Sequence, residues 1–243
     1  MNGFSLTPAL LACGLCLGNL GCNGAPGKPG LQSETVRPNQ VLDFPTLYKQ
    51  NCAACHGEEG KLGAAISLSN PVYLAISGVD NIQRVTAFGV AGTSMPAFGQ
   101  QAGGMLTDRQ VAILAHGVVD RWGRSGVLTG SVPPSYASNS VGDPAQGQKA
   151  FTTFCARCHG ADGFGTSAHG EGQIGSLVDA AYLALVSDQG LRSSIIAGFP
   201  EQNMPDWRSD LPGPGARPMT DQEITDIVAW LGTHRSPTPG QPY

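Results

Sequence analysis

The sequence predicts an all-α protein built from two similar domains in tandem, and three observations support this. A Cys-x-x-Cys-His-Gly motif occurs twice, at residues 52–57 and 155–160. Around each copy, apolar residues recur at helical spacing and the last helical pattern begins at a capping residue. Only 13% of the 243 residues are charged, while 34 are Gly and 18 are Pro. We therefore expect a few short helices in each domain, joined by Gly- and Pro-rich loops.

The two copies match well beyond the cysteine motif, with an offset of about a hundred residues. In each copy a Gly-rich loop follows the motif, a Met-Pro pair comes later, and a closing helix begins at a threonine. Thr220 and Glu223 have the spacing of a capping box at the start of the second closing helix. The matching features are Tyr-Leu-Ala at 73–75 and 182–184, Met-Pro at 95–96 and 204–205, and Thr-Asp at 107–108 and 220–221.

This repeat and the composition between its copies set the expected organisation. The stretch between the copies is rich in Pro, Gly and Ser and poor in large apolar residues, which is typical of a linker. We expect a signal peptide at 1–21, an extended tether at 22–42, a first domain at 43–124, a linker at 125–144, a second domain at 145–235 and a flexible tail at 236–243.

Cys-x-x-Cys-His is the attachment motif of c-type haem, because each thiol can form a thioether with one haem vinyl group. The adjacent histidine then lies under the iron as an axial ligand. A structural zinc site would need four convergent ligands, and a redox dithiol would need a βαβ context. We therefore expect two haem c groups, which would also supply apolar core to two small domains. The predicted attachment residues are Cys52, Cys55, Cys155 and Cys158, and the predicted axial histidines are His56 and His159.

With these features, both halves resemble class I c-type cytochromes, and the whole chain resembles a tandem two-haem member of that family. The resemblance covers most of residues 43–124 and 145–235. It implies a fold in which an amino-terminal helix crosses a carboxy-terminal helix and the haem motif follows the first of them. It also implies a loop that brings a methionine to the far face of the iron.

The resemblance implies that Met95 and Met204 are the second axial ligands, because these two methionines share the Met-Pro context. A thioether is a soft, neutral ligand that raises the haem potential. Methionine is more often a core residue, and we interpret Met105 and Met219, just before the closing helices, as packing or cap-flanking residues. His169 lies in an insertion of the second copy, so a bis-histidine site in place of Met204 stays open.

The copies exchange a large and a small residue where the resemblance places the helix crossing. Aligned on the cysteines, Phe44 corresponds to Gly147, and aligned on Thr-Asp, Gly117 corresponds to Trp230. We predict that Phe44 packs against Gly117 and that Gly147 packs against Trp230. Each crossing would then hold one bulky residue and one that permits close approach.

The start of the chain predicts export. Residues 6–20 form an apolar run of the length of a signal-peptide core, shorter than a membrane span. Leu20-Gly21-Cys22 resembles a bacterial lipoprotein cleavage site, with Cys22 as the lipidated residue; a conventional or uncleaved signal is the alternative. We expect a periplasmic protein or one anchored to the outer face of a membrane.

The formal charge of −4 is unevenly distributed. Residues 43–124 contain six basic and six acidic residues, whereas residues 143–235 contain six basic and eleven acidic residues. This balance argues against a nucleic-acid partner and favours a redox protein with a basic docking surface. The expected partner is a membrane respiratory complex or a soluble cytochrome.

The expected function is electron transport through two covalent haems, without conversion of a substrate. A haem enzyme, such as a two-haem peroxidase or a thiosulfate-oxidising cytochrome, is the second class. Such an enzyme needs an exchangeable coordination position, or a Cys or His ligand at one haem. A third class is the cytochrome subunit of a larger dehydrogenase or oxidase. Co-purification with a flavin, quinone-linked or copper subunit would identify that class.

Overall fold

A computed structural model describes residues 36–167, 173–211 and 216–236. The chain divides into two units, Met1–Gln40 and Val41–Tyr243. In the first unit, the described part holds a short 3-10 helix, η2 (Pro38–Gln40). The predicted signal peptide, Cys22, His169 and residues 237–243 of the predicted tail lie outside the described residues. Within the described ranges, no helix has both the length and the apolar character needed to cross a membrane.

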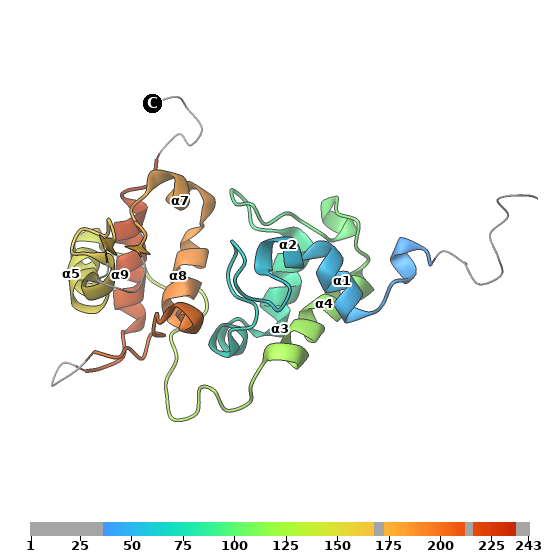
Figure 1. Cartoon of the computed structure of the whole chain (residues 1–243), viewed down its shortest axis with the longest axis horizontal. Coiled ribbons are helices and arrows are strands. Elements are labelled where there is room, and N and C mark those ends of the chain that lie inside the picture. The colour runs from blue at the N-terminus through green and yellow to red at the C-terminus, as the bar shows by residue number, and fades with distance from the viewer. Residues whose placement is uncertain (1–35, 168–172, 212–215, 237–243) are drawn as a thin grey trace, which may run out of the picture. The chain divides into compact units, whose positions relative to one another are not determined.

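The first half of the second unit is helical (Figure 1). Its longest helix, α3, is broken by Gly78, whose φ of 70° and ψ of 159° are not helical. The break divides α3 into two shorter helices, the first of which carries the Tyr-Leu-Ala segment. The elements of this half are α1 (Phe44–Asn51), α2 (Ala53–His56), α3 (Pro71–Phe88), η3 (Gln100–Ala102) and α4 (Asp108–Trp122).

The second half repeats this order, with two separate helices in place of the two parts of α3. Its insertion forms a hairpin of two antiparallel two-residue strands, in which Thr166 pairs with Ile174. The predicted all-α class is confirmed, with this small hairpin as an addition. The elements are α5 (Pro144–Phe154), α6 (Ala156–His159), β1 (Thr166–Ser167), β2 (Gln173–Ile174), α7 (Ala180–Leu185), α8 (Asp188–Ala197), η4 (Pro200–Gln202) and α9 (Asp221–Gly232).

The closing helices α4 and α9 both begin with a capping box. The Thr220 side chain accepts from the Glu223 amide while Glu223 accepts from the Thr220 amide, as predicted. Thr107 and Gln110 form the same reciprocal pair at the start of α4. In both helices two amide donors of the first turn are satisfied by side chains. The second capping box contains the charged Glu223, where the first contains the uncharged Gln110.

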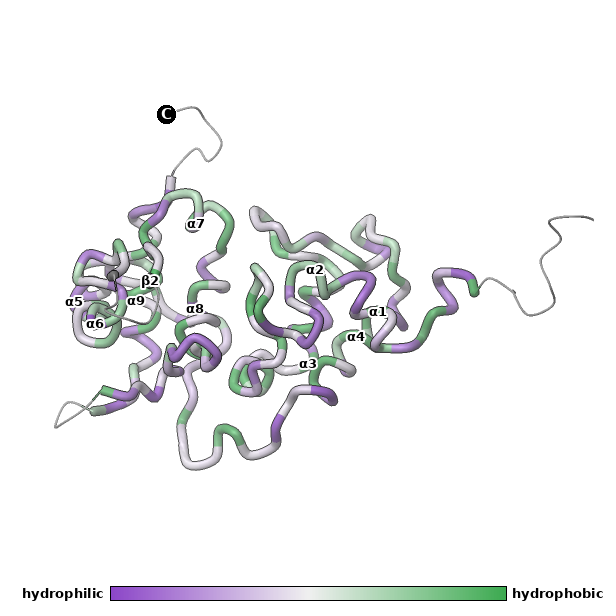
Figure 2. Tube along the Cα trace, viewed as in Figure 1, coloured by the Kyte–Doolittle hydropathy of each residue, from purple (hydrophilic) through white to green (hydrophobic). Residues whose placement is uncertain are grey.

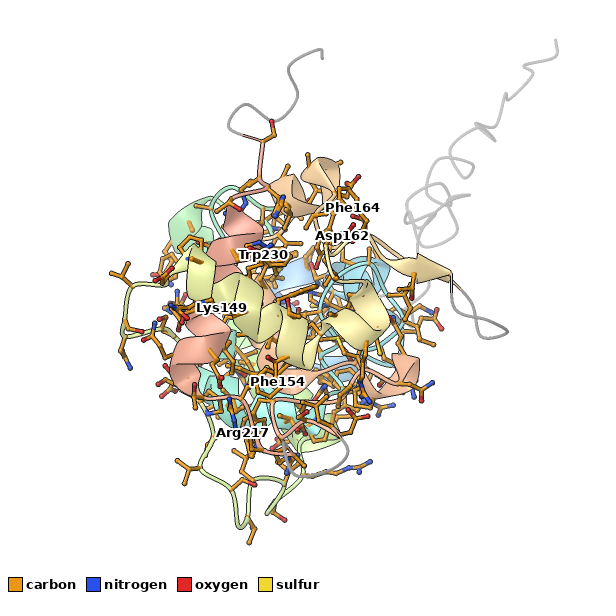
Figure 3. All side chains as sticks on the ribbon, turned by 90° about the vertical axis from the view of Figure 1, so that its left-hand side faces the viewer. Lys149, Phe154, Asp162, Phe164, Arg217 and Trp230 are labelled. Atoms are coloured by element: carbon orange, nitrogen blue, oxygen red, sulfur yellow. The ribbon has the colours of Figure 1, made fainter. Side chains whose placement is uncertain are left out.

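The predicted exchange of large and small residues at the helix crossings is confirmed. A Cβ placed on Gly117 would lie 2.1 Å from Cδ2 of Phe44, so the phenyl ring occupies the space beside that glycine. A Cβ on Gly147 would lie 2.9 Å from Cβ of Trp230 and 1.9 Å from the backbone oxygen of Asp226. Figure 3 shows α5 crossing α9, with Trp230 labelled. The crossings α1–α4 and α5–α9 are therefore both close, but different residues fill them.

Two hydrophobic clusters form the core of the second unit. The first is built around Leu47, Leu114 and Val118, and the second around Phe151, Ile224 and Trp207. Figure 2 shows hydrophobic and hydrophilic residues following one another along the helices, as helices with one buried face require. Each cluster joins the first helix of its half to the closing helix, so the crossing is the centre of each core.

Residues 125–144, between the halves, are tied to the second half by hydrogen bonds. The buried guanidinium of Arg192 donates to the carbonyl oxygens of Ser135 and Tyr136 and pairs with Asp221 at 2.5 Å. Arg208 donates to the carbonyl oxygen of Val127 at 3.2 Å. A buried arginine needs several acceptors to offset its desolvation. The carbonyl groups of this connection supply part of that set.

Candidate haem sites

Each Cys-x-x-Cys-His motif forms one helical turn directly after the first helix. Cys52 ends α1 and begins α2, and the amide of His56 donates to its carbonyl oxygen at 3.0 Å. The amide of His159 donates to Cys155 in the same way, also at 3.0 Å. Residues three and four positions apart lie on one face of a helix. The turn therefore places both cysteines and the histidine of each motif on the same side.

The four cysteines of the described residues are free. Cys52 and Cys155 pack against the two hydrophobic clusters. Burial, and secondly the neighbouring cysteine of the motif, raises the pKa of Cys52 to about 11 and that of Cys155 to about 12. A thiolate is disfavoured in such surroundings, whereas a neutral thioether is not. In the described ranges, no three His, Cys, Asp or Glu side chains converge as metal ligands. The sites therefore suit thioether formation better than a zinc thiolate centre.

His56 is held in the tautomer that a metal ligand requires. Its side chain is buried, and Nδ1 lies 2.8 Å from the carbonyl oxygen of Ile66. A carbonyl oxygen only accepts, so Nδ1 carries the proton and Nε2 keeps its lone pair. Burial lowers the pKa of His56, and the hydrogen bond to Ile66 opposes this. The imidazole is therefore neutral, oriented and able to coordinate iron through Nε2.

The corresponding histidine of the second half has a different environment. Burial lowers the pKa of His159, but its buried Nδ1 has no hydrogen-bond partner among the described residues. The Ser69 amide donates to the Gly60 carbonyl, and the Leu177 amide donates to the Gly163 carbonyl at the equivalent place in the second half. Counted back three residues from these donors, Ile174 is the counterpart of Ile66. Ile174 belongs to the hairpin of the insertion and pairs with Thr166 instead. The insertion thus changes the surroundings of the second histidine.

The two Met-Pro loops share one backbone hydrogen bond. The Val90 amide donates to the Met95 carbonyl at 3.0 Å, and the Phe199 amide donates to the Met204 carbonyl at 3.0 Å. Each loop thus closes on the second residue after the end of the preceding helix. Both methionine side chains are half-buried. The repeat places Met95 and Met204 in equivalent loops, and the pairing of each with its histidine on one iron stays a prediction.

Sequence reasoning missed the glycine beneath each Met-Pro loop. Gly89 and Gly198 have φ values of 68° and 65°, in the region that favours glycine. A Cβ on Gly89 would lie 2.7 Å from the Met95 oxygen, and one on Gly198 would lie 2.6 Å from the Met204 oxygen. Only a residue without a side chain lets the loop approach this closely. Each glycine stands six positions before its methionine, a shared spacing that could have revealed them.

The other methionines and histidines have separate roles. Met219 is buried in the second core and its amide donates to the Trp207 carbonyl at 2.8 Å, which confirms its interpretation as a packing residue. The Met105 side chain is 84% exposed. His116 is exposed, and the rings of His234 and Trp230 meet edge to face with centroids 5.1 Å apart.

The residues present fit a c-type haem. Bound haem supplies an iron that gains and loses one electron. The motif turns supply thiols for covalent attachment and a neutral imidazole, and the Met-Pro loops supply thioethers on a backbone fixed by glycine.

Comparison with known proteins agrees with this geometry. The cytochrome c family model matches residues 144–235, and the model of cytochrome c oxidase, cbb3-type, subunit III matches residues 39–116. A curated relative, the cbb3-type cytochrome c oxidase subunit FixPc of Rhizobium leguminosarum bv. viciae, is 26% identical over 212 residues. The match covers 81% of this chain and 63% of that protein, so the chain spans less than two thirds of the relative's length.

Two solved structures are similar at lower identity. The reducing HAO-like protein complex of Kuenenia stuttgartiensis gives a TM-score of 0.47 at 17% identity, over 79% of this chain and 96% of that chain. The thiosulfate dehydrogenase of Marichromatium purpuratum gives a TM-score of 0.31 at 21% identity, over 84% of this chain and 44% of that chain.

A family model of cytochrome type thus covers each half that contains a Cys-x-x-Cys-His turn. The chain belongs to the c-type cytochromes, as the sequence predicted. It is a two-domain member of that class.

Proposed function

We propose that the chain carries two haem c groups, one in each domain, and relays single electrons between redox proteins. Cys52 and Cys55 attach the first haem, and Cys155 and Cys158 attach the second. The axial pairs are His56 with Met95 and His159 with Met204. The observation that carries this proposal is the duplicated loop, in which a Met-Pro pair closes over a left-handed glycine in both domains.

Reversible electron transfer requires ligands that stay in place when the iron changes charge. The first histidine is fixed by its bond to the Ile66 carbonyl. The methionine loops are fixed by the steric fit of Gly89 and Gly198 against the loop backbone. With two such sites in one chain, electrons enter at one haem and leave at the other.

We further propose that the protein is exported and works as a carrier for a membrane oxidase, as a subunit or as a soluble donor. The match to the subunit III model and the printed description of the relative as an oxidase subunit support this. The excess of acidic residues in the second domain suits a partner with a basic docking surface. Lipidation at Cys22 would keep the carrier at the membrane.

Covalent haem count tests the proposal directly. The intact mass and the pyridine haemochrome spectrum of the purified chain should give two haems. The double substitution C52S/C55S should remove one haem, and C155S/C158S should remove the other. A chain that binds a single haem, or whose haem content survives one of these double substitutions, would contradict the proposed attachment sites.

Ligation separates the carrier from a haem enzyme. Low-temperature magnetic spectra of the oxidised protein should show two low-spin haems, each with histidine and methionine ligands. A high-spin haem in the resting protein would indicate an open coordination position and favour catalysis. Purification of the chain from detergent-solubilised membranes shows whether oxidase subunits accompany it. Co-purification would place the chain within a complex, and isolation of the chain by itself would indicate that it acts alone.

A further inference from the structure

The Asn70 side chain of the first domain contacts the backbone at the end of α8, directly before the methionine loop of the second domain. Asn70 is 3% exposed and precedes α3, where its Oδ1 accepts from the amides of Val72 and Tyr73 at 2.9 and 3.1 Å. Its Nδ2 donates to the carbonyl oxygens of Ala197 and Gly198 at 3.0 and 3.1 Å. Asn70 thus caps the start of α3 and the end of α8 at once.

The contact reaches the proposed ligand through one peptide group. The carbonyl of the Gly198–Phe199 peptide accepts from Asn70, and the amide of the same peptide donates to the Met204 carbonyl at 3.0 Å. The Met204 amide in turn donates to the Phe199 carbonyl at 3.1 Å. A planar peptide held at both ends cannot rotate without breaking a bond. The orientation of the loop therefore depends on Asn70.

The surroundings of Asn70 make this contact part of a buried joint between the domains. Val72 belongs to the second hydrophobic cluster, and Tyr73 and Ile76 pack against it. Burial, and secondly the nearby Tyr136, raises the pKa of Tyr73. Within a buried joint, an amide whose two donors and single oxygen are all satisfied contributes more than an exposed one, because water cannot replace its partners.

Among the described residues of the second domain, the position equivalent to Asn70 carries no amide donor. Asp179 stands in the place of Asn70 at the start of α7, where it accepts from the Tyr182 amide at 2.8 Å. An ionised carboxylate accepts and cannot donate. The repeat therefore retains the helix cap in both copies, while the donor group occurs at Asn70 of the first copy.

From this geometry we propose that Asn70 is a positioning residue for Met204, so that the joint between the domains controls ligation of the second haem. The proposal rests on the proposed ligation by Met204. The first domain would then position a ligand of the second haem in addition to carrying the first haem.

Asn70→Asp tests the proposal in the full holoprotein. The carboxylate keeps the cap of α3 but loses both donors and meets two carbonyl oxygens. The probe is imidazole, which competes with methionine for ferric iron and changes the haem spectrum. Met95→Ala and Met204→Ala assign the two signals. We expect imidazole to bind the second haem about tenfold more tightly in Asn70→Asp, with the first haem unchanged.

Two further variants complete the design. Asn81→Asp is the matched control, because Asn81 Nδ2 donates to the Ser77 carbonyl at 2.8 Å within α3 itself; it should leave both affinities unchanged. Asn70→Ser keeps a capping oxygen and should reproduce the effect of Asn70→Asp if the aspartate variant assembles poorly.

The outcomes separate the inference from the function on which it rests. If Met204→Ala leaves the second haem resistant to imidazole, Met204 is not the ligand and both proposals fail. If Met204→Ala opens that haem while the Asn70 variants bind imidazole as the wild type does, only the positioning role fails. An equal change at both haems would also overturn it, because a general loss of packing would explain that result.

Discussion

The two domains share the backbone features that place the methionines but differ in the side chains that fill their cores. Gly89 and Gly198 have nearly the same φ and the same fit against a Met-Pro loop. The helix crossings, by contrast, exchange Phe44 and Gly117 for Gly147 and Trp230. Core volume can be supplied from either helix, whereas a ligand loop in direct contact with backbone admits one residue type. The comparison therefore separates constraints of packing from constraints of the site.

The largest expected difference between the domains is in the free energy of unfolding lost when the glycine at each helix crossing is substituted. Gly147→Ala puts a Cβ 1.9 Å from a backbone oxygen of α9, so the helices must separate, and we expect a loss of about 3 kcal/mol. Gly117→Ala meets the ring edge of Phe44 at 2.1 Å, and a ring can shift, so we expect about 1 kcal/mol. Urea unfolding of the holoprotein measures both.

A second substitution checks the reason for this difference. Phe44→Leu should recover most of the loss in Gly117→Ala, because the obstacle there is a side chain. Trp230→Leu should not rescue Gly147→Ala, because the obstacle is the Asp226 backbone. Equal losses at the two glycines, or rescue of both, would show that the crossings are not distinguished by backbone contact.

The methionine loops should respond alike to a matched pair of substitutions. Gly89→Ala and Gly198→Ala combine a left-handed backbone with a contact under 3 Å, and we expect each to cost about 2 kcal/mol. Each should also remove the methionine-ligated signal from the haem of its own domain. Magnetic spectra of the oxidised variants measure this.

Gly103→Ala is the control for the methionine loops. Gly103 has a φ of 85°, and a Cβ at this position would meet nothing within 4 Å, so the substitution introduces the backbone strain without the steric contact. It should leave both haem signals intact. Loss of a signal in that variant, or retention of both signals in Gly89→Ala and Gly198→Ala, would refute a role for steric fit.

The sequence was sufficient for the features that depend on local pattern. The capping box at Thr220 and the exchange at Phe44 follow from spacing along one chain and are confirmed. The glycines beneath the loops were missed because composition does not show φ, and Gly89 is one of 34 glycines. Asn70 was missed because its second pair of partners lies in the other domain, at 197–198. Contacts of that kind depend on how two folded surfaces meet.

The capping boxes predict a difference in acid stability between the closing helices. The hydrogen bond from Arg217 is the main cause that lowers the pKa of Glu223 from 4.5 to about 2, and the hydrogen bonds from Thr220 are a smaller cause. A depressed pKa gives stability that is present above pH 4.5 and is lost as the pH falls towards 2. Arg217 is half-exposed, so screening limits the effect to about 1 kcal/mol. Gln110 in the first box carries no charge to lose.

Glu223→Gln tests the acid prediction. It should lower stability at pH 6 and remove this part of the loss between pH 6 and pH 3, as measured by urea unfolding at both values. Gln110→Ala should cost stability equally at the two pH values, because its contribution does not titrate. A wild-type loss that persists unchanged in Glu223→Gln would assign the acid sensitivity to other carboxylates.

The smallest expected difference concerns the two haem potentials. The His56 Nδ1 proton is bonded to the Ile66 carbonyl, which makes the imidazole a stronger donor and favours ferric iron. Among the described residues, His159 Nδ1 has no such partner. One hydrogen bond corresponds to about 40 mV for one electron, so the first haem should have the lower potential by roughly that amount.

The acidic residues of the second domain act in the opposite sense, because negative charge also favours ferric iron and lowers the potential of the haem near it. Salt separates the two effects: screening weakens exposed charges but not a bond to a buried ring. Redox titration, with Met204→Ala to assign the second haem, should therefore give a gap that widens as salt increases. A gap that closes or reverses at high salt would mean that the hydrogen bond to His56 does not set the order of the potentials.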